Sequence, residues 1–234
     1  MTLISCFSTE KNLEDQNTTM KHICVLLLIG VVLASRGFDV SYFQGAPSIS
    51  DFECLVKNGY GDFAVLQAQR STGAYNQYVG QTYRNVKAAG IKYVDMYFFP
   101  SKHHDPVQQV HDTVAKLKAD GVYSSSIQMW IDVENTALYF STCAENVAFL
   151  HKIIDTLHAS WPGRVGMYTS ESQWNPIACN SKEFADMQLW WPRYDGVESL
   201  SHNWASFGGW SRPAVKQYRG SVPMCGTTID EDFY

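Results

Sequence analysis

The sequence predicts an α/β fold, a single modified (β/α) barrel of the TIM type with about eight strands and fewer, partly short helices. Two observations favour it. From residue 35 onward, strand-like and helix-like stretches alternate, and no linker rich in Pro, Gly or Ser interrupts them. The chain of 234 residues is 45% hydrophobic and only 18% charged, so it can bury a core and is not of the disordered class.

Eight stretches have the β-branched and aromatic composition of strands. The fourth lies within Ser124–Asn135, where Met129, Trp130, Ile131 and Val133 are typical of a buried strand. The others are Gly37–Phe43, Asp62–Gln69, Ile91–Phe99, Arg164–Ser170, Asp186–Tyr194, Ala214–Gly220 and Gly226–Tyr234.

Helical signals separate the first five strands. Ser50 and Glu53 form a capping-box pattern that predicts a helix ending at Gly59. Tyr75–Ala89 is expected to be helical. Apolar residues at helical spacing then predict two more helices, with faces formed by Val107, Val110, Val114 and Leu117 and by Val147, Leu150, Ile153, Ile154 and Leu157.

The N-terminal region predicts export. Basic residues after Met20, the apolar run Ile23–Leu33 and a small residue at Ala34 are typical of a signal peptide over residues 20–34. We expect Met1–Thr19 to be an upstream extension, an artefact of the gene model. The predicted location is outside the cell or in a lysosomal or phagosomal lumen. A membrane anchor at residues 20–33 is the alternative.

Cysteine content and charge narrow the class further. Cys54, Cys143, Cys179 and Cys225 follow the signal peptide and predict two disulfides, with three pairings open. Their spacing does not favour a metal site. The formal net charge is −5 and no polybasic tract is present, so nucleic acid is not an expected partner.

Two acids in the fourth strand need an explanation. Because side chains alternate along a strand, Asp132 and Glu134 share a face with Trp130 and point toward the C-terminal mouth of the barrel. Burying an ionised carboxylate without a partner lowers the stability of the fold by roughly several kcal/mol, and a second like charge nearby lowers it further. A protonated acid beside an ionised carboxylate is the equipment of glycoside hydrolysis. The alternative is a strand end whose acids only cap the next helix.

Other strands carry matching residues. Asp39 in the first strand and Asp230 in the last could reach the same mouth, although a turn or salt bridge explains either alone. Aromatic residues that could stack on sugars are Tyr97, Tyr168, Trp191 and Tyr218, whereas Phe98 and Trp190 are expected in the core. His103, His104 and Asp105 could bind a metal, but a solvated loop is the favoured interpretation, and no metal or cofactor is predicted.

In order, the stretches GFDVSYFQG, IQMWIDVEN, GMYTS, LWWPRY, VKQY and IDEDF resemble the strands of glycoside hydrolase family 25, secreted muramidases with a modified α/β-barrel. The resemblance covers residues 36–234. It implies cleavage of the β-1,4 bond between N-acetylmuramic acid and N-acetylglucosamine in peptidoglycan. Glu134 would be the general acid that protonates the leaving oxygen. Asp132 would either attack as the nucleophile or orient and stabilise an attack by the substrate's own N-acetyl group. Asp39 and Asp230 match two supporting acids, and Tyr97 and Tyr168 match ligand positions.

Two positions depart from that family's pattern, Phe98 in place of His and Asp232 in place of Asn. They raise an alternative, a barrel that binds peptidoglycan or signals in innate defence without turnover. A chitinase-type site is disfavoured, because Gln128 and Trp130 stand where its acidic run would be. We therefore predict a monomeric secreted lysozyme acting in antibacterial defence or digestion, with no membrane partner after signal cleavage.

Overall fold

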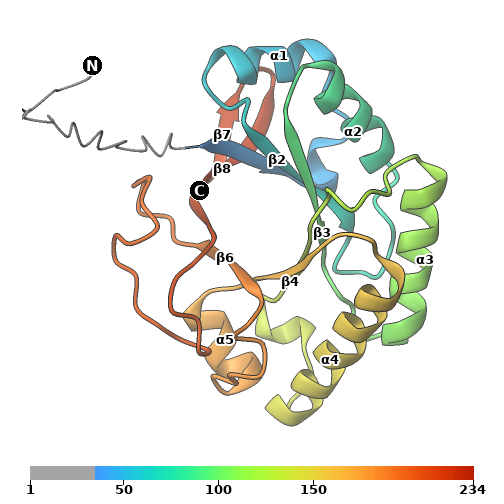
Figure 1. Ribbon diagram of the computed structural model, residues 1–234, viewed down its shortest axis with the longest axis vertical. Helices are drawn as coiled ribbons and strands as arrows, with labels where there is room; N and C mark the ends of the chain where they lie inside the picture. Colours follow the sequence, from blue (N-terminus) through green and yellow to red (C-terminus); the bar gives the residue numbers. More distant parts are fainter. Residues whose placement is uncertain (1–34) are drawn as a thin grey trace, which may run out of the picture. The chain divides into compact units, whose positions relative to one another are not determined.

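Residues 35–234 are described by a computed structural model, in which eight strands close into a barrel in chain order (Figure 1). The predictions for residues 1–19 and 20–34 lie outside the described residues. The strands are β1 (Arg36–Val40), β2 (Phe63–Gln69), β3 (Tyr93–Phe98), β4 (Met129–Asp132), β5 (Val165–Tyr168), β6 (Gln188–Pro192), β7 (Val215–Met224) and β8 (Thr227–Phe233). The helices are α1 (Ile49–Lys57), α2 (Val79–Ala88), α3 (Pro106–Ala119), α4 (Cys143–Ser160) and α5 (Glu171–Ala178), with 3₁₀ turns η1 (Tyr42–Gln44) and η2 (Thr136–Leu138).

The predicted barrel is confirmed, but its sheet is not wholly parallel. β8 runs antiparallel to both β7 and β1, whereas the neighbours from β1 to β7 are parallel. The reason is the short turn at Cys225 and Gly226, which have φ of 53° and 78° and return the chain without a crossover helix. The antiparallel register places Asp230 directly opposite Asp39.

Among the predicted boundaries that differ from the structure, three concern the first two helices and the first strand. The first helix is capped by Ser48, which forms the capping box with Asp51, so the Ser50–Glu53 pattern is not used. The first strand ends at Val40, and residues 42–44 form a 3₁₀ turn. The second helix begins at Val79, because the Asn76 side chain donates to the Gln67 carbonyl and accepts from the Tyr78 N–H, which holds the preceding segment outside the helix.

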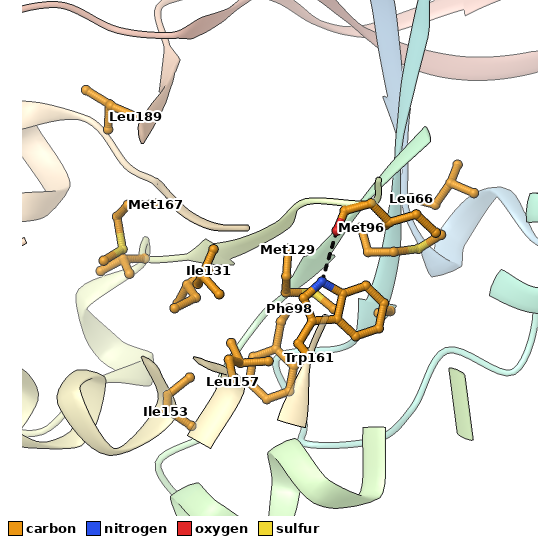
Figure 2. Packing of buried hydrophobic residues seen from close by; sticks show 14 of the residues in the cluster. Leu66, Met96, Phe98, Met129, Ile131, Ile153, Leu157, Trp161, Met167 and Leu189 are labelled. Atoms are coloured by element: carbon orange, nitrogen blue, oxygen red, sulfur yellow. Dashed lines mark hydrogen bonds between the residues drawn. The ribbon is translucent and has the colours of Figure 1, made fainter. Parts of the chain in front are cut away.

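Two apolar clusters follow from the alternation of side chains along the strands. The larger lies between the strands and the surrounding helices, and Figure 2 shows its part around Met96, Phe98, Met129 and Ile131. In it, the Trp161 indole N–H donates to the Ile127 carbonyl at 3.0 Å. The smaller cluster fills the barrel interior and consists of Phe63, Val65, Tyr97, Trp130, Tyr168, Trp190 and Val215.

The side of the barrel between β6 and β7 is covered by a loop instead of a helix (Figure 1). Lys216 on β7 is fully buried and anchors this loop, donating to Asp195 Oδ1 at 2.7 Å and to the Val197 carbonyl at 3.0 Å. Two disulfides also form, as predicted: Cys54–Cys225 joins α1 to the β7–β8 turn, and Cys143–Cys179 joins α4 to the end of α5. Among residues 35–234, no helix is both long and apolar enough to cross a membrane.

Candidate active site

Four carboxyl groups from three strands meet at one end of the barrel. Asp132 ends β4, and Glu134 follows it by two residues. Asp39 on β1 and Asp230 on β8 are paired across the sheet. The charge of Asp230 raises the pKa of both Glu134 and Asp39, which places these groups within electrostatic reach of one another. The structure thus brings together all four acids that the sequence suggested.

The Asp132–Glu134 pair is held in its protonated form more strongly than free carboxyls are. Burial raises the pKa of Asp132 well above its usual range, and the charge of Glu134 raises it further. Burial is also the main cause of the raised pKa of Glu134, followed by the charge of Asp230. Asp132 is only 6% exposed, whereas Glu134 is half-buried, so Glu134 is the carboxyl that a bound molecule can reach.

Gln217 on β7 orders the other two acids. Its Nε2 donates to Asp39 Oδ2 at 2.6 Å and to Asp230 Oδ2 at 3.3 Å. Its Oε1 accepts from the hydroxyls of Tyr168 at 2.7 Å and Tyr194 at 2.8 Å. All hydrogen-bonding positions of one buried amide are therefore directed at the site, which fixes the two carboxyls relative to the two phenols.

Aromatic rings fill the barrel interior next to the acids. Trp190 lies edge-on to Tyr97, Trp130 and Tyr168, with ring centroids 6.2, 6.0 and 4.6 Å away. Trp190 lies in the core as predicted, within the interior cluster, and it also donates its indole N–H to Asp232 Oδ1 at 2.8 Å. Tyr97 and Tyr168 also lie in this interior cluster.

A pocket of about 380 Å³ opens beside Glu134. Its walls include Tyr168 and Trp191, and Tyr194, Asn203 and Phe207 come from the end of β6 and the loop after it. Trp191 is mostly packed outside the barrel, edge-on to Trp204, and reaches the pocket with its remaining edge. Polar and aromatic groups beside a carboxyl group suit a sugar ring.

Two predicted features lie elsewhere. Tyr218 neighbours Gln217 on β7, and because Gln217 faces inward, the Tyr218 side chain faces outward. There its hydroxyl is 3.5 Å from that of Tyr60, which donates to Glu231, so the prediction that Tyr218 contacts substrate is corrected. Phe98 is fully buried between barrel and helices and does not reach the acids.

The His103–Asp105 segment borders a second, shallow hollow of about 490 Å³ between the loops after β3 and β4. Asp105 caps α3 through the N–H groups of Val107 and Gln108, and His104 Nε2 contacts the Thr72 carbonyl. Within residues 35–234, no cluster of three or more His, Cys, Asp or Glu side chains has the geometry of a metal site.

Comparisons with known proteins identify the family of this chain. A family model described as lysozyme-like protein 1 matches residues 35–218. A probable family 25 lysozyme of Dictyostelium discoideum is 35% identical over 92% of the chain and all of that relative. The Caenorhabditis elegans lysozyme-like protein 5 is 32% identical over 92% of the chain and 99% of its own length.

The chain belongs to glycoside hydrolase family 25. A family 25 lysozyme from Aspergillus fumigatus superposes with a TM-score of 0.67 at 23% identity, over 86% of this chain and 93% of the other, and so has the same fold. The predicted barrel fold and the predicted glycoside hydrolase class are therefore both confirmed.

Sequence reasoning missed two residues of this site, Gln217 and Tyr194, and did not assign a role to a third, Asp232. Gln217 and Tyr194 stand in motifs that were recognised, but neither was selected, since an amide in a strand carries no chemical signal of its own. Strand alternation could have found Gln217, because it has the opposite orientation to Tyr218. Asp232 was treated as a departure, and the structure places it beneath Asp39, in contact with Trp190.

Proposed function

We propose that the protein is a secreted muramidase that hydrolyses the β-1,4 bond between N-acetylmuramic acid and N-acetylglucosamine in peptidoglycan. The observation that carries this proposal is the pairing of a reachable Glu134, whose pKa is raised by burial, with a buried Asp132 at the mouth of a family 25 barrel. Two carboxyl groups flanking one bond are what glycoside hydrolysis requires.

The reaction follows from where the proton is held. Glu134 donates its proton to the glycosidic oxygen as the bond from that oxygen to the anomeric carbon breaks. This step requires Asp132 in its ionised form, although burial favours the protonated form; the carboxylate then stabilises the oxocarbenium-like carbon directly or through the substrate's N-acetyl group. Water then adds to that carbon, and its proton returns to Glu134, so the enzyme ends as it began. The Asp39–Gln217–Asp230 bridge and the phenols hold the walls around the reacting sugar.

The test is the identity of the bond that is cut. Purified protein is incubated with peptidoglycan, the new ends are reduced with borohydride, and the reduced sugars are identified. The proposal predicts reduced muramic acid with the wild type and none with Glu134→Gln. Reduced glucosamine ends would assign a different bond. Binding to peptidoglycan without any new ends would favour the alternative of a signalling or binding barrel.

We also propose that the protein acts outside the cytoplasm, in defence or digestion. Two disulfides within residues 35–234 support an oxidising compartment. Protein purified from the culture medium of expressing cells should begin at Ser35. Retention of residues 20–34 on a cell-associated protein would contradict signal cleavage.

A further inference from the structure

Asp232 lies at the floor of the site, one layer below the four acids. It is fully buried, and only one of its two oxygens accepts a hydrogen bond, the 2.8 Å contact from Trp190. Its Oδ2 has no donor among the described residues and is closed to solvent. A buried carboxylate oxygen without a donor destabilises the fold by about 1–3 kcal/mol or more. An ionised Asp232 is therefore unfavourable unless a neighbouring group supplies a proton.

Asp39 is the neighbouring group that can share a proton with Asp232. Asp232 pairs with Gly37 and Asp230 with Asp39 on the neighbouring strand. The Asp39 and Asp232 side chains therefore lie diagonally on the same interior face, where the two carboxyls influence each other's pKa. Asp39 is itself 7% exposed. Two ionised carboxylates in these positions repel each other and neither can donate. If the pair keeps one proton, the same contact becomes an O–H···O hydrogen bond.

No ion pair among the described residues compensates a second negative charge on the pair. The groups facing the pair are Asp230 from β8, Tyr97 from β3, Tyr194 after β6, and the amide of Gln217 from β7. The four ion pairs among residues 35–234 include neither Asp39 nor Asp232. Burial raises the pKa of both groups, and the charge of Asp230 raises both further.

We propose that Asp232 is a positioning residue that shares a single proton with Asp39. The shared proton holds the Asp39 carboxyl toward Gln217 and limits the pair to one negative charge. An Asn at this position would make the same contact with its own N–H and would need no shared proton. This inference goes beyond the proposed function and is tested without substrate, so a failure of the muramidase proposal leaves it standing.

The experiment measures unfolding by urea as a function of pH for the wild type, Asp232→Asn and a matched control, Asp155→Asn. Asp155 lies on the exposed face of α4. The folded wild type keeps one proton on the pair that the unfolded chain releases above about pH 4. The wild type therefore loses stability as pH rises, relative to Asp232→Asn, which needs no proton.

We expect the ratio of the wild-type to the Asp232→Asn unfolding constant to rise by up to about tenfold per pH unit from pH 5 to 8. Asp155→Asn should parallel the wild type. Asp39→Asn should give the same slope difference as Asp232→Asn, because either change removes the shared proton, and it serves if Asp232→Asn does not fold. Parallel curves for the wild type and the two pair variants would overturn the proposal. A role in packing alone would change the stability but not its slope with pH.

Discussion

Gln217 is the residue whose loss should most disturb the site without removing a charge. It makes four hydrogen bonds, two to carboxyls and two from phenols, and it is 2% exposed. Gln217→Met keeps the length of the side chain and removes every one of these contacts. Asp39 then loses its shortest donor while remaining buried.

The size of the effect follows from the contacts. A hydrogen bond to a charged group contributes about 1.5–3 kcal/mol and a neutral one about 0.5–1.5 kcal/mol. Tyr194 is exposed and can turn to water, whereas Tyr168 and Asp39 are buried and cannot. We therefore expect Gln217→Met to lower the free energy of unfolding by about 2–4 kcal/mol. Turnover should fall as well, since the freed Asp39 and Asp230 carboxyls no longer have a fixed separation.

The first assay is urea unfolding at fixed pH. The second is turnover of cell walls without urea, at a temperature where the variant is folded. Gln188→Met is the matched control, because Gln188 lies on the neighbouring strand β6 and its side chain is exposed. The control should stay within about 0.5 kcal/mol of the wild type. If Gln217→Met were equally neutral in stability and turnover, Gln217 would not organise the site.

Three further predictions concern charge, loop and disulfide. Burial raises the pKa of Glu134, so the ionisation of Glu134 opposes folding once the pH exceeds the pKa of this carboxyl in the unfolded chain. Measured by urea midpoints, Glu134→Gln should therefore be more stable than the wild type at pH 7 but not at pH 4. Lys216→Met removes the buried partner of Asp195 and should cost about 1–3 kcal/mol and raise the KM, because the loop that walls the pocket loses its anchor; an unchanged KM would contradict this role. Replacing Cys54 and Cys225 by Ser should cost about 2–5 kcal/mol, since this bond spans 171 residues of sequence, and equal urea midpoints for the variant and the wild type would contradict that contribution.

Much of this fold was predictable because strand alternation and helical spacing are local signals. The barrel and the convergence of Asp39, Asp132, Glu134 and Asp230 followed from acids placed in apolar strands. The direction of β8 did not follow, since it depends on a turn at Cys225 and Gly226 that has no strong sequence signal. The disulfide pairing was equally open, because it requires the positions of segments that are distant in sequence.

The contents of the site were less predictable than its acids. An aromatic side chain packs equally well in a core and against a sugar, so Tyr218 was assigned to the substrate although its hydroxyl lies beside that of Tyr60. Gln217 escaped attention because its role depends on partners from four other segments. Asp232 could be recognised as unusual, but only the structure shows that its neighbour is another carboxyl.

The central claim is that Glu134 delivers the proton that breaks the glycosidic bond. The most direct measurement is kcat/KM on soluble peptidoglycan for the wild type, Glu134→Gln and Glu53→Gln, an exposed glutamate on α1 that serves as the control. We predict a loss of about 10²–10⁴-fold for Glu134→Gln and no change for Glu53→Gln. A folded Glu134→Gln protein that retains the wild-type kcat/KM would contradict the assignment.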